Sequence, residues 1–242
     1  PSVESMHYPT RALSAHEVEY PAVAEAHAAT SLAGGDAVAV WRPSPAHARA
    51  PAAPQVMLPP TPPIEQVITR RGSARRFSRA PIALDQLLAI LTASSQPIPS
   101  DIAPAGRLTT PYLIVNAVSD LAAGTYVYSS GPGLQPLRSG DLRRQAGYLD
   151  LGQELAADAA VNIYSLCNLS DVLSRLGDRG YRAAQLEGAI EGGKLYLSAY
   201  ALGLGATGLT FFDDDVSRFF DVPDHAVMFL TAIGHPGTAR TP

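Results

Sequence analysis

The longest regular pattern in the sequence is helical and covers residues 182–202, about six turns at 3.6 residues each. Segments rich in β-branched and aromatic residues predict strands around it. The predicted helices are residues 62–71, 84–92, 182–202 and 214–220, and the predicted strands are residues 111–118, 124–128, 159–166, 207–211 and 226–233. Because helices and strands mix without a regular strand–helix–strand repeat, the sequence predicts an α+β fold rather than a doubly wound sheet.

The beginning of the chain has a different composition. Up to Pro63 it holds 11 of the 21 prolines and four of the six histidines. The Ala-Pro run over residues 43–63 predicts an extended, semi-rigid segment, and a short helix fits within residues 12–29. We therefore divide the chain into a Pro/Ala-rich arm or linker, residues 1–61, and a folded domain, residues 62–242.

Charge and composition exclude several classes of protein. With 18 Lys and Arg against 22 Asp and Glu, the net charge of −4 argues against a nucleic acid or a membrane surface as partner. The single cysteine, Cys167, excludes a disulfide framework and a multi-cysteine zinc site, and the histidines show no metal-ligand spacing. Residues 1–10 do not resemble a signal peptide, so we expect a cytoplasmic protein.

The glycines at 203, 205 and 208 have the spacing of a dinucleotide-binding fingerprint. That fingerprint must follow a strand and open a helix, so that the helix N-terminus meets the pyrophosphate. Here the glycines follow the long predicted helix and precede a strand. We interpret them as a helix C-terminus, with Gly203 or Gly205 in the left-handed conformation.

Five arginines lie within residues 70–79 and surround Ser73. In an extended backbone Arg71, Ser73 and Arg75 would point the same way, and Arg76 would point away. Guanidinium and hydroxyl groups together suit a phosphate, while a solvated basic loop is the equally weighted alternative.

A second arginine-containing segment, Arg179-Gly180-Tyr181-Arg182, opens the long helix, with Asp178 as the expected N-cap. Tyr181 is interpreted as a core residue. Cys167, which follows an apolar strand, is interpreted as a small buried hydrophobe. Lys194 is the only lysine, so a mechanism that needs a catalytic lysine must use it.

Several segments carry a family resemblance in their order and spacing. They are residues 58–60, 68–78, 81–88, 104–106, 124–128, 179–182, 202–205, 212–214 and 234–236. Together they resemble the nitroreductase superfamily of flavin enzymes over roughly residues 58–237. The resemblance is greatest to the SagB-type branch, which includes azoline dehydrogenases and the oxidase domains of peptide synthetases.

The resemblance implies a mixed or antiparallel sheet flanked by helices, and a homodimer with interlocked long helices and FMN at the interface. Three groups of residues would bind the cofactor. By position, Arg71, Ser73 and Arg75 would hold the phosphate and ribityl chain, the backbone of Gly208, Leu209 and Thr210 would lie against the isoalloxazine ring, and Arg240 would add a phosphate contact from the partner subunit.

The sequence departs from that family at three places. Arg175-Leu176 stands where azoline dehydrogenases tend to have Lys-Tyr as acid/base groups, and an arginine with a pKa above about 12 is a poor base. Residues 104–106 lack the family's flavin-contacting serine, and Gly72 replaces an arginine or histidine. No catalytic residue is assigned, and Tyr181 and Arg175 are candidates by position alone.

The resemblance implies an FMN-dependent oxidoreductase that exchanges hydride between flavin N5 and a small or peptide-derived substrate. It favours azoline-to-azole oxidation. Two alternatives stay open: an NAD(P)H-dependent nitro or quinone reductase, and a degenerate, non-catalytic scaffold subunit for a biosynthetic partner enzyme.

Overall fold

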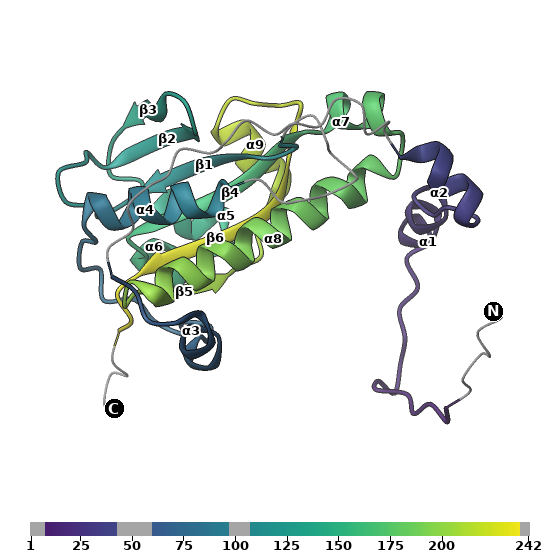
Figure 1. Cartoon of the computed structure of the whole chain (residues 1–242), viewed down its shortest axis with the longest axis horizontal. Helices are drawn as coiled ribbons and strands as arrows, with labels where there is room; N and C mark the ends of the chain where they lie inside the picture. The colour runs from purple at the N-terminus through teal and green to yellow at the C-terminus, as the bar shows by residue number, and fades with distance from the viewer. Residues whose placement is uncertain (1–7, 43–59, 97–106, 238–242) are drawn as a thin grey trace.

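The computed structural model describes residues 8–42, 60–96 and 107–237. In these residues one six-stranded sheet has the order β3-β2-β1-β4-β6-β5 (Figure 1). The strands are β1 (Thr110–Val115), β2 (Gly124–Ser129), β3 (Gly133–Ser139), β4 (Val161–Asn168), β5 (Gly205–Gly208) and β6 (His225–Gly234). Every neighbouring pair is antiparallel. The predicted α+β fold is therefore confirmed.

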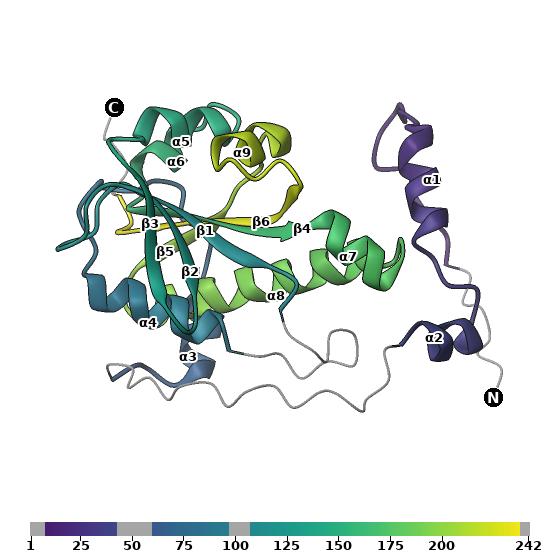
Figure 2. The ribbon, with the colours of Figure 1, turned by 90° about the horizontal axis from the view of Figure 1, so that it is seen from above.

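Helices cover both faces of the sheet, as Figure 2 shows. The helices of the body are α3 (Ile64–Arg70), α4 (Leu84–Ser94), α5 (Arg143–Leu149), α6 (Glu154–Asp158), α7 (Leu169–Leu176), α8 (Gly180–Ala201) and α9 (Asp213–Phe219). Helices α4 and α8 lie on one face, and α5, α6 and α9 lie on the other. Each face has its own apolar cluster of buried side chains. Among the described helices, none is long and apolar enough to cross a membrane.

The long helix α8 packs very closely on β6. A methyl group at Gly188 would lie 2.7 Å from Cβ of Met228, and one at Gly192 would lie 2.5 Å from Cδ1 of Phe229. Real Cβ atoms do not approach that closely, so glycine at these positions is what allows the helix to lie so near the strand.

The two ends of α8 test two predictions. At its C-terminus Gly203 has φ +76°, and the N–H of Leu204 donates to the carbonyl of Ala199 at 2.9 Å. The predicted left-handed glycine is thus confirmed. Because a helix C-terminus repels phosphate, these glycines do not form a dinucleotide-binding fingerprint. At its N-terminus the prediction was wrong. The N-cap residue is Arg179 rather than Asp178, with helical dihedral angles and no side-chain cap.

The N-terminal arm contains two helices, α1 (Pro21–Ala29) and α2 (Gly35–Trp41), which lie beyond the N-terminal end of α8 (Figure 1). The helix expected within residues 12–29 begins only at Pro21, and α2 was not predicted. Trp41 attaches α2 to the body. Its Nε1 donates to the carbonyl of Leu176 at 2.7 Å, and its ring packs at the α7 end of the body.

Several body elements were not predicted, namely β3, α5, α6 and α7. Strand β3 is an exposed edge strand that contains Pro136, and an edge strand tolerates proline because one of its sides is unpaired. Strand β5 begins two residues earlier than predicted because Gly205 pairs with Gly234 at the end of β6. These boundaries depend on pairing partners that lie far away in the sequence.

Candidate functional site

The segment after α3 is anchored along the outer edge of β5. The N–H of Ala74 donates to the carbonyl of Ala206 at 2.9 Å. Ala74 is buried, whereas Arg71, Ser73 and Arg75 on either side of it are exposed. Gly72 and Arg76 are exposed as well, so exposure alone does not separate the three expected site residues from their neighbours. The segment that carries them lies beside β5, at the edge of the sheet.

The second predicted segment continues from that same strand. Gly208 ends β5, and it and Thr210 are exposed, while Leu209 packs partly against the core. A methyl group at Gly205 would lie 3.2 Å from Cβ of Ala74, so the small residues let the two segments lie side by side. The fold therefore brings together six of the seven residues proposed for the cofactor. Arg240 lies outside the described residues.

Tyr196 links the two segments and was missed from the sequence. Its hydroxyl accepts a hydrogen bond from the N–H of Gly208 and lies 3.5 Å from Oγ of Ser73. Tyr196 is half-buried on α8. Nothing in the sequence separates it from the other tyrosine of this part of the helix, Tyr200, because the choice depends on how α8 is rotated against β5.

The two positional candidates for catalysis lie elsewhere. Arg175 is an exposed residue of α7, and it forms an ion pair with Asp171 at 2.9 Å. Tyr181 is 42% exposed, so its interpretation as a core residue was wrong. Its hydroxyl accepts from Nε2 of Gln185 at 3.1 Å. Tyr181 lies fifteen residues before Tyr196 on α8, which is about 22 Å of helix. Within one chain, Tyr181 is therefore too far from Tyr196 to belong to the same site.

The arginines beside Tyr181 hold the N-terminal arm. Nε of Arg182 donates to Oγ1 of Thr30 at 2.7 Å, and Arg179 donates to the carbonyl of Thr30 at 3.0 Å. The guanidinium of Arg179 also lies 5.5 Å from the ring centre of Trp41. These contacts assign both arginines to tertiary structure, a role that their spacing did not indicate.

An acidic pair on α8, the half-buried Glu187 and the buried Glu191, was also missed. Glu187 accepts from the backbone N–H groups of Leu108 and Thr109 at 2.8 and 2.9 Å. Glu191 is 1% exposed and accepts from Arg107 at 2.5 Å and from Ser165 at 2.8 Å. The carboxylates are satisfied by these donors, so they bind the start of β1 to α8.

The buried cysteine is unsuited to nucleophilic chemistry, and the lysine is engaged in a hydrogen bond. Cys167 is buried as predicted, and burial raises the pKa of its thiol to about 11. The Nζ of Lys194 donates to the carbonyl of Gln96 at 2.6 Å, and burial, with Arg107 nearby, lowers the pKa of Lys194. Among the described residues, no three His, Cys, Asp or Glu side chains gather in a metal-binding group.

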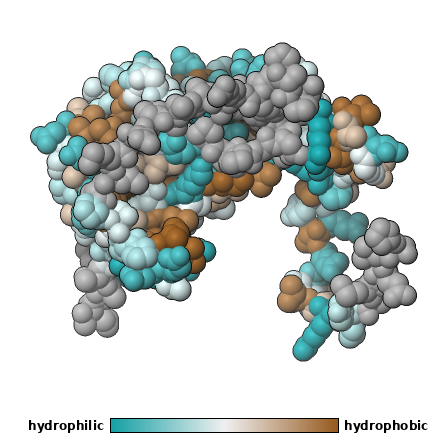
Figure 3. Space-filling model, viewed as in Figure 1, coloured by the Kyte–Doolittle hydropathy of each residue, from teal (hydrophilic) through white to brown (hydrophobic). Residues whose placement is uncertain are grey.

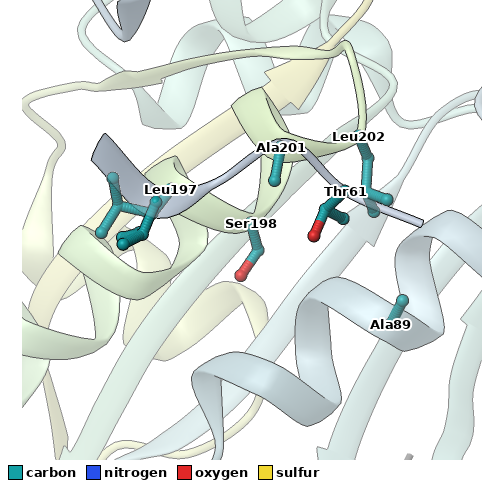
Figure 4. A pocket seen from close by; sticks show the side chains of 7 residues that line it. Thr61, Ala89, Leu197, Ser198, Ala201 and Leu202 are labelled. Atoms are coloured by element: carbon teal, nitrogen blue, oxygen red, sulfur yellow. The ribbon is translucent and has the colours of Figure 1, made fainter. Parts of the chain in front are cut away.

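A small apolar pocket of about 130 Å³ lies between α3, α4 and α8 (Figure 4). Its lining residues are Thr61, Ile64, Ala89, Leu197, Ser198, Ala201 and Leu202. None of them is charged, and ligand pockets usually measure about 300–1,000 Å³. The arginine and glycine segments form a separate, open surface.

Comparison with known proteins defines the class of protein. Residues 68–235, more than half of the chain, match the Nitroreductase family. The chain therefore belongs to the nitroreductase family of oxidoreductases.

Individual relatives agree with this assignment. A protein of Methanocaldococcus jannaschii named as a nitroreductase, MJ1384, is 23% identical over 175 residues, which are 69% of this chain and 88% of the relative. A crystal structure named as a nitroreductase from Anabaena variabilis is 32% identical with a TM-score of 0.66, and the match covers 72% of this chain but only 38% of that longer chain.

A second similar structure is the E. coli microcin synthetase McbBCD complex with truncated pro-MccB17 bound. It has a TM-score of 0.61 and 16% identity, and the match covers 78% of this chain and 79% of that chain. At this identity the likeness shows a shared fold.

Proposed function

We propose that the chain is an FMN-dependent oxidoreductase. The observation that carries the proposal is the exposed set Arg71, Ser73 and Arg75 beside the exposed backbone of Gly208 and Thr210. Two guanidinium groups and a hydroxyl on one side of a strand fit a phosphate. The neighbouring glycine leaves its backbone open to a planar ring. The donor set therefore fits FMN.

Within this proposal the chain's own residues bind and orient the cofactor. Arg71, Ser73 and Arg75 hold the phosphate and ribityl chain, Arg240 of the partner subunit adds a phosphate contact, and the backbone of residues 208–210 lies against the ring. FMN, when bound, supplies hydride transfer at N5.

The direction of the reaction has two versions. The SagB-type resemblance favours oxidation of an azoline in a peptide-derived substrate, and a protein of the same fold occurs in a microcin synthetase complex. The ion pair of Arg175 with Asp171 favours the alternative, a nitro or quinone reductase that uses NAD(P)H, because no acid/base pair stands at that place. Anaerobic NADPH that bleaches the bound flavin supports the reductase, and flavin that stays oxidised supports the oxidase.

We expect Arg71→Ala to lower the affinity for FMN by about 10- to 100-fold, because it removes a charge-assisted bond to the phosphate. Arg76→Ala is the matched control: it removes an exposed arginine of the same segment, which an extended backbone directs away from the site, and should change the affinity by less than twofold. Titration of flavin fluorescence measures both. Equal losses in the two variants would favour the solvated-loop interpretation, and a wild-type chain that binds no FMN would favour the non-catalytic scaffold.

We further propose a homodimer, with FMN at the interface. The cofactor residues of one chain are exposed, so one chain alone does not enclose the ligand. Apolar residues gather in the hollow below the sheet, between the arm and α3 (Figure 3). Tyr181 and Leu186 of α8 are 42% and 50% exposed. If two α8 helices pack antiparallel, the Tyr181 end of one approaches the Tyr196 end of the other.

Leu186→Glu should weaken the dimer roughly 100-fold, because it would bury an unpaired charge between the subunits. Leu137→Glu is the matched control, since Leu137 is 49% exposed but lies on β3 at the far edge of the sheet. Analytical ultracentrifugation measures the dissociation constants. A Leu186→Glu protein that stays as dimeric as the Leu137→Glu protein would place the interface elsewhere.

The division of the chain at residue 61 belongs to the same proposal. Residues 62–242 would form the catalytic domain, and residues 1–61 an arm that packs at the end of α8. A biosynthetic partner enzyme belongs to the oxidase version and to the scaffold alternative.

A further inference from the structure

Tyr196 stands at the junction of the two halves of the candidate site. Its hydroxyl contacts Gly208 from the ring-facing segment and Ser73 from the phosphate-facing segment. No other side chain is recorded with hydrogen bonds to both segments in the described part of the chain. Tyr196 comes from α8, a rigid element packed on the sheet, so its hydroxyl is held in place independently of either segment.

The chemistry of these groups fixes the direction of one of the two hydrogen bonds. A backbone N–H can only donate, so the N–H of Gly208 makes the Tyr196 oxygen an acceptor. Oγ of Ser73 lies 3.5 Å from the same oxygen, at the long limit of a hydrogen bond, and either hydroxyl can donate in that contact. Ser73, once it accepts from Tyr196, has its own proton left to donate outward, between Arg71 and Arg75.

We propose that Tyr196 is a positioning residue that makes Ser73 a hydrogen-bond donor toward the phosphate, and that it thereby sets the preference of the site for FMN over riboflavin. The relay runs from the Gly208 amide through Tyr196 to Ser73. Such chains strengthen each bond in turn, because each donor is polarised by the bond that it accepts. The inference rests on the proposed function, since it names the residue that tunes the same phosphate site.

The test measures dissociation constants for FMN and riboflavin by fluorescence titration of the full chain. We expect Tyr196→Phe to weaken the binding of FMN about three- to tenfold, which is the effect of about one net hydrogen bond. The affinity for riboflavin should stay unchanged. In a Ser73→Ala background Tyr196→Phe should have no further effect on FMN. Tyr148→Phe is the control, because it removes a hydroxyl that bonds only to Asp215 on the other face of the sheet. Equal melting temperatures show that all variants are folded.

Two results overturn the relay. One is an equal loss of riboflavin and FMN affinity, which would mean that Tyr196 only packs against the ring or the ribityl chain. The other is an undiminished effect of Tyr196→Phe in the Ser73→Ala background. If the wild-type chain binds neither flavin, the proposed function fails, and inorganic phosphate then decides the relay by thermal shift. Weaker stabilisation by phosphate in Tyr196→Phe than in wild type supports it, and equal or absent stabilisation overturns it.

Discussion

Asp150→Asn is expected to abolish most of the pH dependence of stability between pH 4 and pH 8. Asp150 is fully buried at the end of α5, and its Oδ1 accepts from the hydroxyl of Tyr164 at 2.9 Å. Its Oδ2 has no partner among the described residues. Burial raises the pKa of this carboxyl to about 8, against which the hydrogen bond from Tyr164 acts only weakly.

The sign follows from proton binding. Above pH 4 the unfolded chain releases this proton, whereas the folded chain keeps it until the pH approaches 8. The contribution of Asp150 to the stability of the folded state is therefore largest below pH 4, and it declines as the pH rises to about 8. The difference amounts to on the order of 5 kcal/mol. Asparagine stays neutral and keeps an acceptor for Tyr164, so the variant should lack this decline.

Urea unfolding at pH 5, 6, 7 and 8 measures the effect. Asp215→Asn is the control. Hydrogen bonds from Arg218 and Tyr148 lower the pKa of Asp215, so its contribution is lost only in acid. The free energy of unfolding of Asp215→Asn should decline between pH 5 and pH 8 as that of the wild type does. An Asp150→Asn protein with the wild-type slope would show that Asp150 is already ionised in the folded chain.

Gly188→Ala should destabilise the protein by about 1–3 kcal/mol, although alanine is the better helix former by about 1 kcal/mol. The new methyl group would lie 2.7 Å from Cβ of Met228, an atom that the backbone of β6 holds in place. Helix α8 would have to move away from the sheet, which loosens its packing along the strand.

Gly193→Ala makes the same change on the same helix, where nothing lies within 4 Å of the added methyl group. This variant should gain up to about 1 kcal/mol, since only the helix propensity changes. The two variants should thus differ by about 1–4 kcal/mol. Urea unfolding below the concentration at which the chain associates measures the difference. Equal stabilities would mean that α8 is free to shift on β6.

The candidate site was predictable as far as local patterns reach. The alternation of Arg71, Ser73 and Arg75 follows from an extended backbone, and the sequence shows it without a structure. The resemblance placed Gly208 and its neighbours in the same site. That the two segments touch depends on the hydrogen bond between Ala74 and Ala206, which joins residues 132 positions apart.

The residues that were missed share one property. Tyr196, Glu191 and Asp150 matter because of groups that approach them from other elements. A helix that is apolar on most sides, as α8 is, has no periodic signal to show which side chain faces a site. The same applies to Arg182, which holds Thr30 of the arm.

The sequence by itself determined the class of fold, the helical period of α8 and its end at Gly203, because each depends on residues within a few positions of one another. Only the tertiary structure decided that β5 lies at the sheet edge beside Ser73, that Tyr196 reaches both segments and that Asp150 is buried. Long-range pairing and burial make these choices, and no local pattern records them.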